Sequence, residues 1–303
     1  MICIYLKNNF MNNCLICNTN KLKFLFYFYS QILPNRFRSL QICKVCGHIQ
    51  ISPRFEHLEY ASINNLYFSK VYANLTNHVN NNQSNLKKLL TVQHYVKPFL
   101  YNGIKVLDIG AGEAWSRNLF KNFDVEYDFI ESVDLLSEKI LDSGGKKVSN
   151  SIDDDISDFY GKYDLILFRH VLEHLLNPRE AIEKCRLLLN DTGKLYLEVP
   201  NGIPSTSENI SKIYKKGFRT SFIRPIHISY FCVENINLLT SFYGLNPVIL
   251  EVKNDIHGVF EKCDMKNIDI TNNYKRNRKI MLNHYYKFFL TDLKQIIKSI
   301  FYK

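Results

Sequence analysis

The sequence lacks any apolar run that approaches the roughly 18–20 residues a membrane-spanning helix needs. The aromatic stretch FLFYFY at residues 24–29 is too short for that purpose. The opening residues MICIYL follow no basic region and precede no small-residue cleavage site, so they match a secretory signal poorly. We therefore expect a cytoplasmic protein, in which disulfides are uncommon and paired cysteines more often bind metal.

An excess of basic charge is also missing from most of the chain, although the net charge is +10. Residues 275–303 contain eight Lys or Arg and one acid, Asp292, and so account for +7 of that charge. The remainder of the chain is close to neutral. This distribution indicates a basic tail and argues against a body built to bind nucleic acid.

Two common nucleotide-binding motifs are absent. The segment VLDIGAGEAW, residues 106–115, carries an apolar run into a turn that contains Gly110 and Gly112. A dinucleotide fingerprint would require a third glycine at position 115, which holds the only Trp of the chain. A triphosphate-binding loop would require Gly-Lys followed by Ser or Thr. The turn therefore favours a nucleoside-like ligand that carries no pyrophosphate.

Four of the eight cysteines form a pattern. CLIC and CKVCGH place two C-x-x-C knuckles on either side of residues 18–42, with Cys14, Cys17, Cys43 and Cys46 as the thiols. Four thiolates with this spacing predict a closed, structural Zn²⁺ site with no position for a reactive water. The alternatives are unrelated core cysteines or a redox dithiol, although a redox pair is usually a single motif.

Apolar segments that alternate with helical patterns from Lys105 onward predict an α/β, Rossmann-like fold with a mostly parallel sheet. We expect strands at residues 105–110, 125–131, 146–152, 163–168 and 193–201, and helices at 114–123, 135–145, 177–190 and 232–245. Residues 246–252 and 257–263 are expected to form an antiparallel hairpin at the edge of the sheet.

The pattern divides the chain into four parts. We expect a zinc-binding module at residues 1–55, a helical connector at 56–100, the α/β domain at 101–265 and a basic amphipathic tail at 266–303. Helical spacing in the connector predicts one apolar face made of Leu86, Leu89, Leu90, Val96 and Leu100.

An acid follows the second expected strand. In sheets of this kind the ligand lies beyond the carboxyl ends of the strands, and an acid about 20 residues after the first glycine binds ribose hydroxyls. Glu131 has this spacing from Gly110, with Asp128 and Asp134 as nearby alternatives.

The quoted turn, FIES at 129–132, and YDLILFRHVLEHLLNPREAIEKCRLLLNDTGKLYLEVPN at 163–201 together resemble a class I S-adenosylmethionine-dependent methyltransferase. The resemblance covers roughly residues 100–260. The double C-x-x-C and the HISYF segment at 227–231 resemble a subgroup with an N-terminal zinc-binding domain. That subgroup includes sugar C-methyltransferases and other enzymes of small-molecule or polysaccharide-linked acceptors.

The resemblance implies roles for particular residues. The turn would line the methionine part of the cofactor, Glu131 would hold the ribose, and the residues after the third strand would flank the adenine. Residues that end the fourth strand would face cofactor and substrate. The turn residues are Asp108, Gly110, Ala111 and Gly112, and the ribose acid is Glu131. The residues beside the adenine are Ser151 and Ile152, and those that end the fourth strand are Arg169 and His170.

Candidate catalytic groups are histidines, since a hydroxyl or acidic carbon acceptor benefits from a base with a pKa near neutral. We expect His227 to be a base or a substrate contact, and His170 to be a second candidate beside the cofactor. The Glu173–His174 pair is interpreted mainly as a cap or packing device. Tyr230 is a candidate for a hydroxyl that orients the acceptor, although an aromatic residue there is more often part of the core.

Two features depart from the family pattern. Ala114-Trp115 is bulkier than the glycine-rich norm, and the Glu/Tyr/His signature of the sugar C-methyltransferases is missing after PN at 200–201. The main hypothesis is O- or C-methylation of a small molecule or of a nucleotide- or lipid-linked sugar. The alternatives are an RNA methyltransferase, and a non-catalytic, zinc-stabilised interaction protein.

The tail contains a possible amphipathic helix at residues 284–303 with flanking lysines. It would suit an anionic membrane surface or a polyprenyl-linked substrate. Packing on the protein itself, or on a second subunit in a homodimer, is the favoured interpretation.

Overall fold

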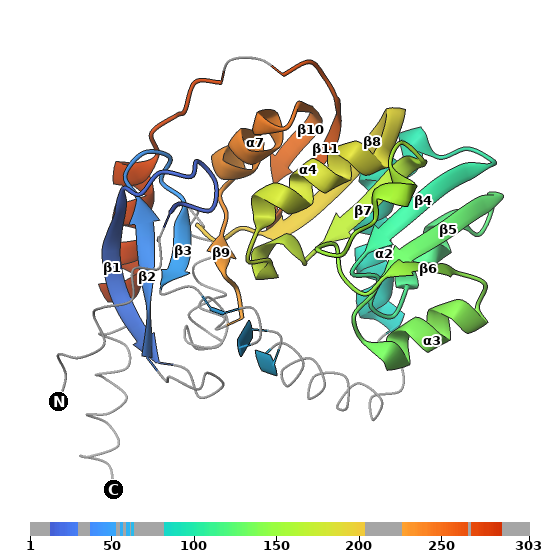
Figure 1. The fold of residues 1–303 in the computed structure, drawn as a ribbon, viewed down its shortest axis with the longest axis horizontal. Helices are drawn as coiled ribbons and strands as arrows, with labels where there is room; N and C mark the ends of the chain where they lie inside the picture. The colour runs from blue at the N-terminus through green and yellow to red at the C-terminus, as the bar shows by residue number, and fades with distance from the viewer. Residues whose placement is uncertain are drawn as a thin grey trace, which may run out of the picture.

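The computed structural model describes residues 13–29, 37–52, 55–56, 59–60, 62–63, 82–203, 226–265 and 268–286. These residues build two β-sheets, one of seven strands and one of four. Figure 1 shows the larger sheet with its helices on one side of the molecule and the smaller sheet on the other.

The larger sheet has the strand order β10-β11-β8-β7-β4-β5-β6. Strands β6, β5, β4, β7 and β8 run parallel, while β11 is antiparallel to β8 and to β10. This confirms the predicted Rossmann-like sheet with its edge hairpin. Its strands are β4 (Ile104–Ile109), β5 (Val125–Ile130), β6 (Lys146–Ser149), β7 (Tyr163–Arg169), β8 (Leu189–Pro200), β10 (Leu245–Val252) and β11 (Asp255–Lys262).

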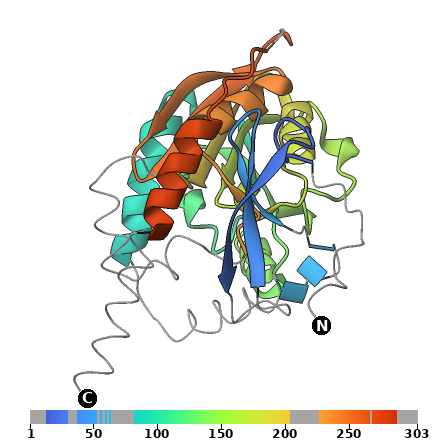
Figure 2. The same cartoon turned by 90° about the vertical axis from the view of Figure 1, so that its left-hand side faces the viewer.

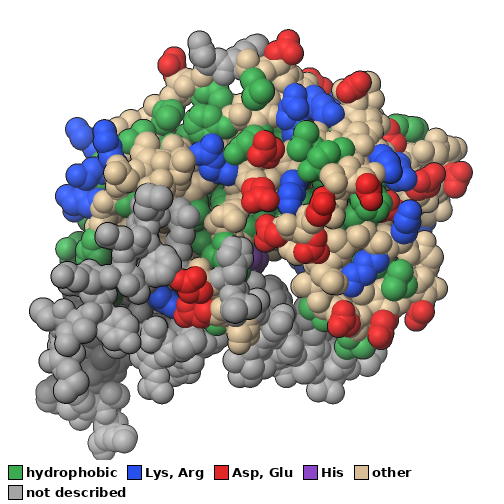
Figure 3. All heavy atoms as spheres, in the orientation of Figure 1, with side chains coloured by type: hydrophobic (Ala, Val, Ile, Leu, Met, Phe, Trp, Pro, Cys, Tyr) green, Lys and Arg blue, Asp and Glu red, His purple; other side chains and the backbone are tan. Residues whose placement is uncertain are grey.

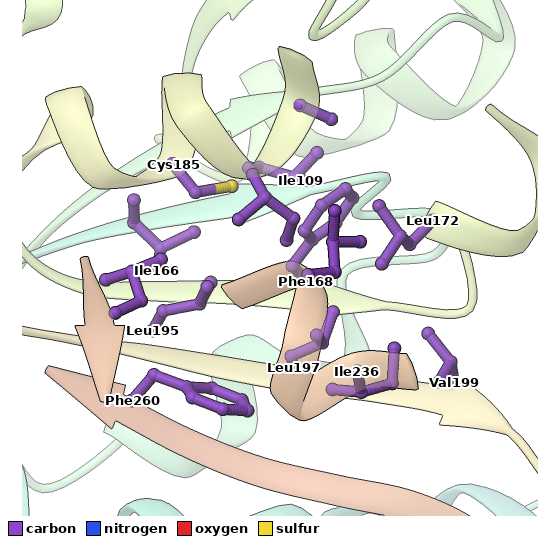
Figure 4. Close-up of a cluster of buried hydrophobic side chains, with 14 of the residues drawn as sticks. Ile109, Ile166, Phe168, Leu172, Cys185, Leu195, Leu197, Val199, Ile236 and Phe260 are labelled. Carbon is purple, nitrogen blue, oxygen red and sulfur yellow. The ribbon is translucent and has the colours of Figure 1, made fainter. Parts of the chain in front are cut away.

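The central strands are buried on both faces, which is why they are apolar without alternation. One face carries Ile109, Ile166 and Phe168, which pack with α4 (Pro178–Leu188) and α7 (Val233–Phe242). Figure 4 shows this layer, with Cys185 of α4 above the strands and Ile236 of α7 beside them. Val106 and Leu167 point to the opposite face.

That opposite face is covered by α2 (Asn82–Val96), the 3₁₀ helix η2 (Trp115–Phe120) and α3 (Asp134–Asp142). Further 3₁₀ turns are η1 (Lys97–Phe99), η3 (Ser157–Phe159) and η4 (Leu172–His174). Because β5 and β6 lie on one side of β4 while β7 and β8 lie on the other, the strand order reverses between β4 and β7. A cleft for a ligand is expected at that point.

The smaller sheet joins the N-terminal residues to a much later segment. Its order is β1 (Leu22–Tyr29), β2 (Phe37–Cys43), β3 (Ile49–Ser52) and β9 (Ser229–Tyr230), all antiparallel. Helical residues 274–286 pack on it, with Tyr285 stacked on Phe26 at 4.5 Å between ring centroids. Figures 1 and 2 show this red helix beside the blue strands.

Two local predictions were wrong. The expected helix at 114–123 is only the short η2, because Ala114 is left-handed with φ 49° and the Ser116 hydroxyl bonds to Asp108 instead of capping a helix. The predicted apolar face of the connector is wrong only in part: Leu89, Val96 and Leu100 pack in the core, but Leu90 is 55% exposed and Leu86 is exposed too. Val92 and Tyr95, which the prediction left out, complete the buried face.

Only residues 284–286 of the predicted tail helix fall within the described residues, and 287–303 lie outside them. Among the described residues, no helix has the length and apolar composition that crossing a membrane requires.

The corrected face of α2 is testable. Val92→Ala removes methyl groups from a fully buried position and should lower the free energy of unfolding by about 1–3 kcal/mol. Leu90→Ala on the exposed side should change it by less than about 0.5 kcal/mol. Urea unfolding of both variants measures the difference, and equal losses would contradict this packing.

Candidate active site

The glycine turn after β4 lies at the point where the strand order reverses. Gly110 is left-handed with φ 71°, and a Cβ there would lie 2.3 Å from Val171 Cγ2. Any other residue would therefore be strained and would clash. The amides of Gly110 and Ala111 donate to Ile130 O at 2.8 and 3.3 Å, which fixes the turn against the end of β5.

Asp108 anchors this turn from inside the protein. It is buried, and its Oδ2 accepts hydrogen bonds from the hydroxyls of Ser116 and, at 2.7 Å, Tyr127. Burial raises the pKa of Asp108, while the two hydroxyls oppose that shift. The carboxylate thereby ties η2 and β5 to the end of β4.

Glu131 is the acid that the structure brings to the turn. It is buried at the end of β5, where Oε2 accepts from the Gly112 amide at 2.8 Å and Oε1 from the Val133 amide at 2.9 Å. Of the alternatives, Asp128 accepts from Tyr163 at 2.8 Å within the core, and the side chain of Asp134 is 90% exposed. Glu131 is therefore the acid placed to meet a ligand at the turn.

The two residues predicted beside the adenine follow β6. The Ser151 amide donates to Asp154 Oδ2 at 3.0 Å, which holds the loop. Ile152 is buried and packs in the cluster beneath α4, and its carbonyl accepts from Lys184 Nζ at 3.0 Å. Its side chain is thus part of the core that supports this loop.

Arg169 ends β7 and meets Glu198 of β8. Arg169 Nε donates to Glu198 Oε2 at 2.6 Å, and the guanidinium lies over the Trp115 ring at 4.3 Å. Tyr196 donates to Glu198 Oε2 at 3.0 Å. Glu198 was not among the site residues predicted from the sequence, although a lone acid within the apolar strand residues LYLEV was a usable signal.

His170 lies between two carboxylates in a left-handed conformation with φ 52°. Its Nε2 is 3.1 Å from Glu198 Oε1 and its Nδ1 is 3.7 Å from Glu173 Oε1. Partial desolvation lowers the pKa of His170, whose side chain is 41% exposed, but the nearby Glu173 carboxylate and the hydrogen bond to Glu198 outweigh that effect and raise it to about 10. A protonated His170 donates hydrogen bonds and cannot accept a proton, which weakens its candidacy as a base.

His227 meets Glu173 and His174 on the other side of β7. The rings of His174 and His227 are 4.8 Å apart and nearly perpendicular, and His174 Nδ1 donates to Ile226 O at 3.1 Å. Within the described residues, Glu173 Oε2 has no hydrogen-bond partner. Burial raises the pKa of Glu173, but His170, His174 and His227 lower it to about 2.

The Glu173–His174 pair, expected to act mainly as a cap or packing device, is joined by His227 in a trio. One ligand atom from each of Glu173, His174 and His227 lies within 4.8 Å of the others, as do those of His170, Glu198 and Asp255. The trio has the chemistry of a proton-transfer site, and its two histidines and one carboxylate also suit a divalent metal. In Figure 3 a histidine is visible near the middle of the molecule, with acidic side chains just above it.

The four predicted zinc ligands converge. The Sγ atoms of Cys14, Cys17, Cys43 and Cys46 lie within 4.8 Å of one another, and Cys14–Cys46 and Cys17–Cys43 are each 3.5 Å apart. Amides of Ile16 and Val45 point at Sγ atoms, as in thiolate sites. The residues present fit a tetrahedral metal site.

Comparisons with known proteins agree with this geometry. The model of a family described as "Methyltransferase domain" matches residues 80–250. The chain is 26% identical over 146 residues to ubiquinone biosynthesis O-methyltransferase of Xanthomonas axonopodis pv. citri, covering 42% of this chain and 59% of that protein. The protein of the same name from Glaesserella parasuis is 25% identical, covering 44% and 64%. The chain thus spans less than two thirds of these relatives' length.

A solved structure shows the same fold. The 1,6-didemethyltoxoflavin-N1-methyltransferase of Burkholderia thailandensis, with bound 1,6-didemethyltoxoflavin and S-adenosylhomocysteine, aligns with a TM-score of 0.52. The alignment has 15% identity and covers 75% of this chain and 96% of that chain.

The charge of His170 predicts a pH-dependent contribution to stability. Because its pKa is raised above the ordinary 6.5 to about 10, the contribution is complete below pH 6.5 and disappears as the pH rises through 10. Asn tolerates the left-handed backbone, so we expect His170→Asn to be destabilising at pH 6 and nearly neutral above pH 10. Urea midpoints of both proteins across this range test it; a constant difference would contradict the assignment.

Proposed function

Because the chain belongs to the family of methyltransferase domains that matches residues 80–250, we propose that it transfers the methyl group of S-adenosylmethionine to a hydroxyl oxygen of a small-molecule acceptor. As a class I S-adenosylmethionine-dependent methyltransferase, the chain uses a methyl group that the sulfonium already activates. The observation that carries the proposal is the pair of sites on either side of β7. Glu131 lies at the glycine turn, and His227 lies with Glu173.

The turn suits the nucleoside part of this cofactor. The left-handed Gly110 and Gly112 leave the backbone open to close approach. Glu131 offers two carboxylate oxygens, which suit the two ribose hydroxyls. Asp108 and Glu131 are acidic, and so favour a ligand that carries a positive sulfonium and ammonium. Ser151 and Ile152 remain the proposed adenine neighbours.

We assign the base to His227. The acceptor oxygen forms a bond to the methyl carbon as the carbon–sulfur bond breaks, S-adenosylhomocysteine leaves, and the hydroxyl proton passes to His227. Glu173 lies within 4.8 Å and stabilises the resulting imidazolium. In this scheme His170 is a protonated hydrogen-bond donor and does not act as the base.

The acceptor is proposed as a hydroxyl because the relatives are named O-methyltransferases. The HISYF segment and the N-terminal cysteines support a hydroxyl of a nucleotide- or lipid-linked sugar as the acceptor class. Carbon methylation is less favoured because the signature expected after PN is missing.

We also propose that Cys14, Cys17, Cys43 and Cys46 hold a structural Zn²⁺ ion, supported by their convergence. Amide side chains from distant parts of the chain donate hydrogen bonds to the backbone of the second knuckle. Asn235 of α7 donates to Cys46 O at 3.1 Å, and Asn277 donates to Gly47 O at 3.0 Å. Metal binding would therefore also order contacts to α7 and to helical residues 274–286.

Calorimetric titration with S-adenosylhomocysteine tests the cofactor, with NADH as the negative control. Glu131→Gln should weaken binding about 10- to 100-fold, because it removes the charged acceptor of the ribose hydroxyls. Asp134→Asn, at the exposed alternative acid, should leave it unchanged. No binding by the folded wild-type protein would refute the proposed function.

The same preparation tests the base. In a screen of phenolic and sugar hydroxyls that follows S-adenosylhomocysteine release, His227→Gln should lower turnover about 10²- to 10⁴-fold while S-adenosylhomocysteine affinity stays unchanged. Undiminished turnover in this variant would exclude His227 as the base.

Metal analysis tests the zinc site. The purified protein should contain about one zinc ion per chain, which Cys43→Ser should lose together with thermal stability. Cys263→Ser, outside the cluster, should retain both. A zinc-free protein with native stability would disprove the site.

A further inference from the structure

We propose that Arg169, fixed by Glu198 and Trp115, binds the carboxylate of the methionine half of S-adenosylmethionine. This inference rests on the proposed function, because it assigns the part of the cofactor that the glycine turn and Glu131 do not account for. It also gives Trp115 a role at a position where the family pattern is glycine-rich.

Arg169 lies beside the glycine turn, where the cofactor is expected. Phe168 pairs with Ile109 in the parallel register of β7 and β4, so the next residue, Arg169, lies alongside Gly110. Trp115 begins η2 directly after the glycine turn. The contact of 4.3 Å between the guanidinium and the indole ring therefore spans the two strands between which the order reverses. The guanidinium lies at the edge of the expected ligand cleft.

The guanidinium of Arg169 has hydrogen-bond donors that the described residues do not use. The Arg169 side chain is only 11% exposed. Its Nε donates to Glu198 Oε2 at 2.6 Å, and among the described residues no other hydrogen bond from this side chain is present. A guanidinium has further N–H donors on its two terminal nitrogens. Those of Arg169 are not among the buried unpaired atoms of the described residues, so they are open to an incoming ligand. A carboxylate ligand would accept two of them side by side.

The charges of the site also match those of the ligand. Bound S-adenosylmethionine brings two positive groups, the sulfonium and the ammonium, and one negative group, the carboxylate. The acids Asp108 and Glu131 suit the positive groups, and Arg169 suits the negative one. Because Glu198 is paired with Arg169, the guanidinium does not add an uncompensated positive charge beside the sulfonium.

Trp115 and Glu198 act as positioning residues in this arrangement. The indole face holds the planar guanidinium in one orientation, and Glu198 holds it from the side through Nε. Glu198 also accepts from Tyr196 at 3.0 Å and lies 3.1 Å from His170 Nε2, so its own position is fixed by buried partners. The terminal nitrogens are thereby left to face the ligand.

The test compares ligands that differ in the carboxylate. Calorimetry with wild-type protein and Arg169→Gln would use S-adenosylhomocysteine, decarboxylated S-adenosylmethionine, which keeps the sulfonium and ammonium, and 5′-methylthioadenosine, which lacks the whole amino-acid end. We expect the variant to lose about tenfold or more in affinity for S-adenosylhomocysteine and to bind the other two as the wild type does.

Two further variants keep the test informative. Arg169→Lys retains the charge without the planar fork and should show a smaller loss of the same selectivity, even if Arg169→Gln folds poorly. Arg179→Gln is the matched control, because Arg179 also lies over aromatic rings, those of Phe242 and Tyr243, but on α4. It should bind all three ligands normally.

Equal losses for all three ligands would overturn the proposal, because they would mean that Arg169 only supports the shape of the site. Unchanged affinity for S-adenosylhomocysteine in both Arg169 variants would overturn it as well, and would favour a contact to the acceptor. Failure of the wild-type protein itself to bind S-adenosylhomocysteine would refute the proposed function. This outcome differs from failure of the Arg169 assignment, because it is seen without any variant.

Discussion

Two buried carboxylates, Glu173 and Glu198, constrain everything else at the carboxyl ends of β7 and β8. Their side chains are 2% and 6% exposed, and a buried ionised carboxylate is costly unless charged or hydrogen-bonding partners surround it. Glu198 is met by Arg169, His170 and Tyr196. Glu173 is met by His170 and His174, with His227 close by. His170 contacts both acids, so it links the cofactor side of β7 to the proposed acceptor side.

The proposed acceptor side depends on the joining of the two sheets. The Ile228 amide donates to Glu173 O at 2.7 Å, and the Ile51 amide donates to Ile228 O at 3.0 Å. The adjoining β9 pairs with β3 next to the cysteine knuckle. The segment that carries His227 is therefore held through the backbone of its neighbour Ile228, which bonds to both parts of the molecule. The N-terminal strands thus support the segment that carries His227, the proposed base, and a zinc ion bound there would stabilise them.

The bulky pair Ala114-Trp115 is compatible with the family fold at a local cost. Ala114 adopts the left-handed conformation that a glycine would adopt without strain, and the following helix is reduced to η2. In return the indole ring reaches the guanidinium of Arg169. This exchange explains how a turn without its last glycine can still bound a cofactor cleft.

The alternation of strands and helices, the edge hairpin and the acid at the turn could be predicted from the sequence alone. These features depend on local periodicity and on fixed spacing from the glycines, as Glu131 illustrates. The four cysteines could also be identified by spacing. The full buried face of α2 and the length of η2 could not be predicted, because packing and the Asp108–Ser116 hydrogen bond override local propensity there. The contacts of Glu198 with Arg169 and of His227 with Glu173 are visible only in the folded chain. Residues far apart in the chain come together there through sheet pairing, and no local pattern records which strands will be neighbours.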